Sequence, residues 1–116
     1  MAQVIADRRD MDFVLYEQMK IEDLLGYKRY EGLNRKVFDM IISEARTFAV
    51  KELLPTYAEG DRIGLRFEKG QVKVPESFHR PHKLLIEGEW TALNEDPELG
   101  GQGLPTSIGM AVAEFI

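Results

Sequence analysis

The segment "LNRKVFDMIISEARTFAVKELLP", residues 33–55, constrains the fold of this chain more than any other part. Apolar residues recur in it at intervals of three and four, and charged residues populate the other side. The apolar positions are Phe38, Ile41, Ile42, Ala45, Phe48, Ala49 and Leu53. This spacing predicts a long amphipathic helix whose apolar stripe is core rather than a ligand pocket. Pro55 should end it, because the residue before a proline is pushed out of the helical region.

The N-terminal part predicts a shorter helix. Asp7 or Asp10 can cap a helix over residues 11–19. Its apolar residues lie at helical spacing and would form one buried stripe: Met11, Val14, Leu15 and Met19. About one further turn follows over residues 21–25, and Gly26 is well placed to end it in the left-handed conformation.

A loop and a small hairpin should follow the long helix. Residues 56–64 have the composition of a loop, and residues 65–74 alternate apolar and polar side chains around Lys69-Gly70. Because an isolated two-stranded hairpin is only marginally stable, we expect this one to lean on the helices.

Two more helices are predicted towards the C-terminus. The first runs from about Arg80 to Glu87, with Pro81 in its first turn and Gly88 as its C-cap. The segment after it should pack on an apolar surface through Trp90, Ala92 and Leu93. The last helix starts at Pro105 or Thr106 and is apolar on most of its circumference. Since such a helix is normally buried in something larger than 116 residues, we expect the chain to be truncated within it. The predicted fold is an all-α small helical bundle with a minor β-hairpin.

Charge and composition exclude several classes of function. Fifteen Lys and Arg against twenty Asp and Glu give a net charge of −5, which argues against nucleic acid or an anionic membrane as a partner. No stretch approaches the roughly 20 apolar residues of a membrane span. The chain has no cysteine, so it can form neither a disulfide nor a thiolate metal site. We therefore expect a cytoplasmic location.

The glycine-rich stretch "DPELGGQGLP", residues 96–105, allows two interpretations. It could cradle a phosphate, or it could be a tight turn into the last helix. The stretch lacks the Lys-Ser/Thr end of a nucleotide P-loop, the third glycine of a dinucleotide fingerprint and a preceding strand. The residues therefore favour a helix entrance.

No catalytic or metal site is predicted from the remaining polar residues. His79 and His82 lie three apart with Glu76 nearby, a spacing that metal ligands can have, but no clear third and fourth ligand accompany them. Glu87 and Glu89 could be imagined as an acid and base pair, yet nothing predicts a cleft around them. Surface histidines and solvated carboxylates are the better interpretation.

Three stretches together carry a family resemblance: "ADRRDMDFVLYEQ", "EARTFAVKELLPTYAEGDRIG" and "EGEWTALNEDPELGGQGLPTSIGMAVAEFI". In this order they resemble the N-terminal helical part of acyl-CoA dehydrogenases, and more narrowly the long bacterial type that begins with a short extra helical segment. Glu89, between Gly88 and Trp90, departs from the family's Gly-Trp turn. The resemblance divides the chain into an N-terminal helical extension (1–30) and a helical domain (31–116) of a larger three-domain enzyme.

The resemblance implies an enzyme of fatty-acid β-oxidation that removes the α and β hydrogens of an acyl-CoA with FAD, and that passes electrons to an electron-transfer flavoprotein. In that family the flavin and the base glutamate lie in later domains, so the resemblance implies no cofactor and no catalytic residue in this chain, which would be inactive alone. It also implies that the loop of Gly100, Gly101, Gln102 and Gly103 lies beside the substrate cavity.

Two expectations concern partners. The partners implied by the resemblance are the flavin-binding domains of the parent enzyme; a free-standing helical interaction module without catalysis is the alternative. The apolar last helix further predicts self-association, because Ile108, Val112, Phe115 and Ile116 would be exposed if nothing else covered them. The simplest form is a two-fold dimer with residues 100–103 as a hinge.

Overall fold

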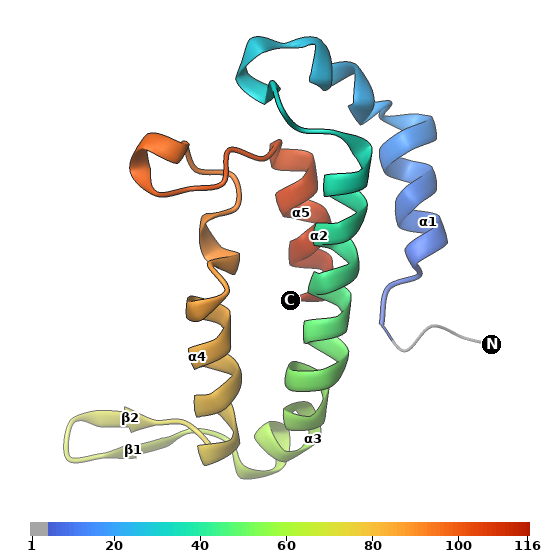
Figure 1. Ribbon diagram of the computed structural model, residues 1–116. Helices are drawn as coiled ribbons and strands as arrows, with labels where there is room; N and C mark the ends of the chain where they lie inside the picture. The colour runs from blue at the N-terminus through green and yellow to red at the C-terminus, as the bar shows by residue number, and fades with distance from the viewer. Residues whose placement is uncertain (1–4) are drawn as a thin grey trace.

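The computed structural model describes residues 5–116, so the first four residues of the expected 1–30 extension lie outside the described residues. The described chain is mostly helical with one small hairpin, which confirms the predicted fold class (Figure 1). Its α-helices and strands are α1 (Arg8–Asp12), α2 (Arg35–Phe48), α3 (Leu54–Ile63), β1 (Arg66–Glu68), β2 (Gln71–Lys73), α4 (His79–Glu87) and α5 (Thr106–Phe115). Two π-helical stretches, Phe13–Gln18 and Ala49–Leu53, prolong α1 and join α2 to α3.

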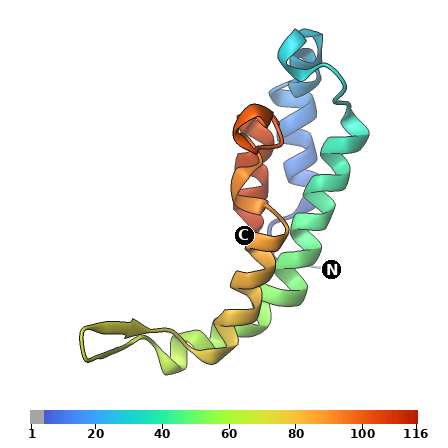
Figure 2. The same cartoon turned by 60° about the vertical axis from the view of Figure 1, so that its left-hand side comes forward.

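The helices form an open layer rather than a compact ball. In Figure 1, α2 runs through the middle with α5 beside it, α1 on one side and α4 on the other, and Figure 2 shows the hairpin extending away from the helices. The molecule measures 53 × 41 × 17 Å, with a radius of gyration of 16.8 Å. A compact domain of this length would have a radius of gyration of about 13 Å. The chain therefore exposes more surface than a globular domain of its size.

The core lies where α5 packs on α2. Phe38 and Ile42 on α2 and Ile108 on α5 are each 0% exposed. On α5, Val112 and Phe115 are also buried, which corrects our expectation that this face would be uncovered without further chain. The helix folds back on its own domain, and the apolar residues it leaves most accessible are Met110 and Ile116.

The long helix does not end at Pro55, which corrects both that prediction and the loop predicted over residues 56–64. The π-helical stretch shifts the hydrogen bonding, so that the N–H of Leu54 donates to the carbonyl of Ala49. Pro55 then lies in the first turn of α3, directly after the π-helical stretch, a position in which proline is common. The helix continues to Ile63, and Gly64 ends it with a φ of +69°.

The N-terminal helix begins at the predicted cap but buries fewer residues than expected. The Asp7 side chain accepts hydrogen bonds from the N–H groups of Arg9 and Asp10. Leu15 is buried, whereas Val14 and Met19 are exposed, so the predicted stripe is wrong at these two positions. The four predicted residues nevertheless share one face, because Met11, Val14, Leu15 and Met19 all line one open groove beside α5. Only the extent of burial differs from the prediction.

The turn at Gly26 also differs from the prediction. Gly26 has no positive φ, and the residue in the left-handed conformation is Lys20, at φ 51°, before the 3₁₀ turn Ile21–Gly26. The left-handed residue thus precedes this turn and does not end it. A second 3₁₀ turn, Lys28–Tyr30, leads towards α2, which Asn34 caps.

The hairpin has the predicted turn but not the predicted support. Lys69 and Gly70 both have positive φ, as a two-residue type I′ turn requires. All six strand residues are exposed, among them Phe67 at 74% and Val72 at 63%. The expectation that the hairpin leans on the helices is therefore wrong, because the prolonged α3 and the turn at Gly64 direct it outwards (Figure 2).

The features predicted around α4 are confirmed. Pro81 lies in the first turn and Gly88 is the C-cap. Glu89, the residue that departs from the family pattern, takes the left-handed conformation at φ 56°. Trp90 then stacks on Phe48, with ring centroids 6.1 Å apart, and Leu93 is buried. The aromatic stack joins the end of α4 to the end of α2.

Candidate functional site

The glycine-rich loop is a closed turn held by its own backbone. The five successive N–H groups of residues 100–104 all donate within the loop region, to the carbonyls of Pro97, Asp96, Ala92, Glu95 and Leu93 in that order. Gly100 and Gly103 have φ of +88° and +65°, a conformation that favours glycine. A loop whose N–H groups are used in this way has none left to cradle a phosphate, so the geometry supports the helix-entrance interpretation.

Close packing explains two more glycines. A Cβ atom on Gly101 would collide with the Glu95 carbonyl, and one on Gly109 of α5 would collide with the Asn94 side chain. Leu104 and Pro105 are buried immediately before α5 begins. The loop is therefore clamped onto the start of the helix, which gives no support to its predicted role as a hinge.

The loop makes little contact with any hollow of the described chain. Of the four predicted cavity residues, Gln102 lines a small hollow of about 220 Å³ beside Trp90 and Leu93, whereas Gly100, Gly101 and Gly103 line none of the grooves described here. The placement of this loop beside a substrate cavity stays a prediction. The same backbone geometry does not fit a flavin pyrophosphate, because the glycine N–H groups already have acceptors.

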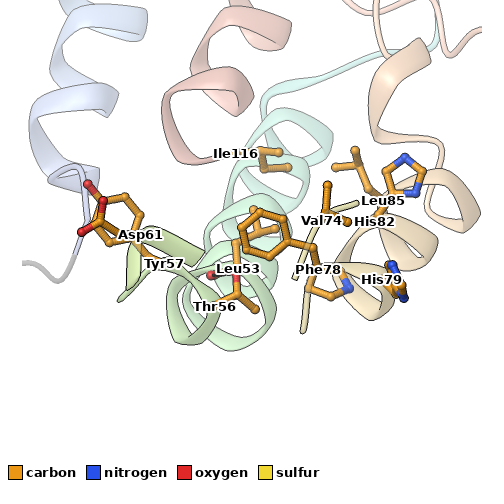
Figure 3. Close-up of a pocket in the computed structure, with 11 residues that line it drawn as sticks. Leu53, Thr56, Tyr57, Asp61, Val74, Phe78, His79, His82, Leu85 and Ile116 are labelled. Carbon is orange, nitrogen blue, oxygen red and sulfur yellow. Dashed lines mark hydrogen bonds between the residues drawn. The ribbon is translucent and has the colours of Figure 1, made fainter. Parts of the chain in front are cut away.

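A wide groove lies between α3 and α4 (Figure 3). This α3–α4 groove has a volume of about 800 Å³ and a mostly apolar lining: Leu53, Thr56, Tyr57, Asp61, Val74, Phe78, His79, Pro81, His82, Leu85 and Ile116. Figure 3 shows Leu53, Phe78 and Ile116 around the same space. This groove was not predicted from the sequence, because α3 was predicted to be a loop. A signal was present in the sequence, since proline is common in the first turn of a helix.

Two contacts hold the walls of the α3–α4 groove together. Gly60 lets the Phe78 ring lie directly on α3, where a Cβ would collide with ring carbons. Arg80 on α4 forms a two-pronged ion pair with Glu52, with Nε–Oε2 and Nη2–Oε1 distances of 2.9 and 3.2 Å. The hydrogen bond from Arg80 lowers the pKa of Glu52, and the same bond raises the pKa of Arg80. The pair fixes α4 against the π-helical end of α2.

A second groove lies between α1 and α5. It measures about 720 Å³, and three methionines contribute to its lining: Met11, Met19 and Met110. Val14 also lines it, so the residues of the predicted stripe that are exposed face this groove. Methionine side chains adapt to differently shaped apolar surfaces. The groove is thus an apolar surface suited to contact with another part of a larger protein.

Asp39 is the centre of a polar network that the sequence analysis also missed. Its Oδ1 atom accepts hydrogen bonds from the Tyr16 hydroxyl at 2.7 Å and from Arg8 Nη2 at 3.2 Å. The Arg35 guanidinium lies 3.9 Å from the centroid of the Tyr16 ring. Burial, and then the hydrogen bond to Asp39, raises the pKa of Tyr16 well above its ordinary value. The network holds the N-terminal helix on α2.

The other candidate side chains are exposed and separate. His79 Nδ1 lies 3.3 Å from Glu76 Oε2, and His82 also lines the α3–α4 groove. Glu87 lies 3.7 Å from Lys83 Nζ on the outside of α4. Within residues 5–116 no three His, Asp or Glu side chains gather as a metal site would require. In the same range, no helix has both the length and the apolar character needed to cross a bilayer.

The structure is a helical layer with a glycine-rich turn at the entrance to α5 and two apolar grooves on its surface. Comparisons with known proteins agree with the resemblance seen in the sequence. No model of a known protein family matches the chain. Two curated proteins do: 3-methylmercaptopropionyl-CoA dehydrogenase of Ruegeria pomeroyi, 25% identical over 108 residues, and the broad-specificity linear acyl-CoA dehydrogenase FadE5 of Mycobacterium tuberculosis, 26% identical over 110 residues. The chain is thus related to acyl-CoA dehydrogenases.

The match covers most of this chain but only a small part of each relative. The matched residues make up 93% of this chain but only 18% of each relative. The resemblance to the family is therefore confirmed along nearly the whole chain. The narrower assignment to the long bacterial type stays a prediction.

Proposed function

We propose that this chain acts as the N-terminal helical domain of an FAD-dependent acyl-CoA dehydrogenase, where it covers the acyl-CoA site and helps to exclude water from it. The observation that carries this proposal is the similarity of 93% of the chain to two acyl-CoA dehydrogenases of which it spans 18%. The reaction is the α,β-dehydrogenation of an acyl-CoA thioester in fatty-acid β-oxidation, in the cytoplasm.

The shape of the chain supports a covering role. A layer 17 Å thick with two apolar grooves has the form of a lid that packs on another domain. The backbone N–H groups of residues 100–104 are already used, so we propose that FAD is held elsewhere in the enzyme. When bound there, the flavin supplies the hydride acceptor and passes electrons to an electron-transfer flavoprotein. The residues of this chain contribute the covering surface, and by itself the chain binds no FAD and is inactive.

A free-standing interaction module is the second candidate, favoured by the same exposed apolar surface. Antibodies against residues 5–116 can separate the two by capturing the native product from its own cells. We expect a product, or a tight complex, that carries stoichiometric flavin absorbance and reduces a dye when an acyl-CoA is added. A captured product without flavin and without dehydrogenase activity would contradict the proposal and favour the interaction module.

A further inference from the structure

Every residue of strands β1 and β2 in the hairpin is exposed. Among residues 5–116 the sheet contains only these two strands, so no described strand pairs with the outer edge of either. β1 forms the lower edge of the hairpin in Figure 1, and both strands extend away from the helices. Two strands alone are marginal in water, whereas a sheet of three or more strands with an apolar face can be stable. A further strand on one of these edges would therefore stabilise the hairpin.

The two faces of the hairpin differ in chemistry. Alternation places Phe67 and its cross-strand partner Val72 on one face, and Arg66, Glu68, Gln71 and Lys73 on the other. On the polar face, Arg66 lies directly opposite Lys73. Like charges directly opposite each other destabilise a strand pair. Glu68 Oε2 is 3.5 Å from Lys73 Nζ, and within residues 5–116 Arg66 has no ion pair. A carboxylate placed beside Arg66 by another strand would offset this repulsion.

A second copy of β1 would supply that carboxylate. In a hairpin closed by a two-residue turn, the residues beside the turn exchange hydrogen bonds, and such pairs alternate along the strands. Glu68 and Arg66 therefore bond towards β2, and the N–H and C=O of Phe67 point to the free edge of β1. An antiparallel pairing centred on Phe67 uses these outward groups. It also places Arg66 of each copy opposite Glu68 of the other.

We propose that two copies of the chain associate by antiparallel pairing of β1 with β1 about a two-fold axis at Phe67, which gives a four-stranded sheet. The pairing forms two Arg66–Glu68 ion pairs on the polar face and sets the two Phe67 rings side by side on the other. The outer edge of β2 offers no such match, because the same pairing centred on Val72 would place Lys73 opposite Gln71. This inference does not depend on the proposed function, and it replaces the last helix, whose apolar face is buried, as the basis for self-association.

Cysteine cross-linking tests the register of the pairing. The chain contains no cysteine, so a Phe67→Cys variant carries one thiol. In the proposed dimer the two Cα atoms at this position are about 5.5 Å apart, within the range a disulfide spans. Val72→Cys is the matched control, because Val72 is similarly exposed but would lie about 14 Å from its copy, three strand spacings away.

We expect mild oxidation to give a covalent dimer of Phe67→Cys and to leave Val72→Cys monomeric. A Phe67→Cys variant that stays monomeric would overturn the proposal. So would equal cross-linking of the two variants, which would indicate random collision or another edge.

Charge reversal tests the chemistry of the pairing in sedimentation equilibrium. Arg66→Glu or Glu68→Arg alone turns both ion pairs into like-charge pairs, and we expect roughly tenfold to a hundredfold weaker dimerisation. The double variant, and an equimolar mixture of the two single variants, restore opposite charges across the axis. Both should dimerise again, which separates lost pairing from lost folding. Failure of both the double variant and the mixture to dimerise, or single variants that dimerise as well as the original chain, would refute the proposed pairing.

Discussion

Replacing Ile108 with alanine should lower the free energy of unfolding more than replacing any exposed residue of α5, because Ile108 belongs to the core of this domain. Ile108 is 0% exposed, and Ile108→Ala removes three buried carbon atoms. At roughly 0.8 kcal/mol for each buried methylene-sized group, the lost burial amounts to about 2.4 kcal/mol. The cavity left behind adds about 1 kcal/mol if the surrounding helices close only partly around it.

The total loss of about 3 to 4 kcal/mol is large for such a chain. A domain of 116 residues has a free energy of unfolding of roughly 6 to 17 kcal/mol. Urea unfolding followed by the helical circular dichroism signal measures the difference. The control is Met110→Ala, on the same helix but 64% exposed, for which we expect a loss of less than about 1 kcal/mol.

The comparison of the two variants decides whether α5 is docked on α2 in the chain by itself. If Ile108→Ala lost no more stability than Met110→Ala, the helix would not be part of this core. The side chains of its apolar face would then be exposed in solution, as the sequence had led us to expect.

Three further predictions concern the contacts that fix the layer. Because burial and the hydrogen bond to Asp39 raise the pKa of Tyr16 in the folded chain, the unfolded chain loses the phenolic proton at a lower pH. The stabilisation from the protonated Tyr16 is therefore full below about pH 10 and is lost as the pH rises above it. Tyr16→Phe should remove this part of the loss of stability at alkaline pH, measured by urea titrations at rising pH. Because the pKa of Glu52 is lowered by Arg80, its stabilisation should fade as pH falls below about 4.5, and Glu52→Gln should show a smaller loss of thermal stability on acidification; an equal loss would contradict this. Gly101→Ala should lower the unfolding free energy by about 1 to 3 kcal/mol, since its Cβ meets the Glu95 carbonyl, and an unchanged urea midpoint would show that the loop yields freely.

Much of the fold could be predicted because it depends on local features. Three local features were predicted correctly: the spacing of the apolar residues in residues 33–55, the cap at Asp7 and the turn at Lys69-Gly70. Each of them depends only on residues that are close together in the sequence. The resemblance to acyl-CoA dehydrogenases was likewise carried by short stretches in a fixed order, and the comparisons confirm it. The glycine loop was correctly predicted to lead into the last helix, since positive φ at glycine is also a local property.

Other predictions failed where a local signal had two outcomes. Proline stops a helix from within but suits its first turn, and the π-helical stretch before Pro55 decides between the two. Val14 and Met19 lie on the predicted stripe but are exposed, because the groove that they line between α1 and α5 is open. A π-helical stretch depends on how the helix packs against its neighbours, which periodicity does not contain.

The sequence by itself determined most of the helical segments other than α3, where the hairpin turns, and which enzymes the chain is related to, because propensity, spacing and motif order reside in neighbouring residues. Only the tertiary structure decided that α5 covers α2, that Asp39 gathers Tyr16 and Arg8, and that the hairpin stands free with Arg66 uncompensated. These outcomes depend on residues far apart in the chain. Which side chains are buried and which charges pair depends on how the helices and strands pack against each other, and this packing is not contained in the local sequence.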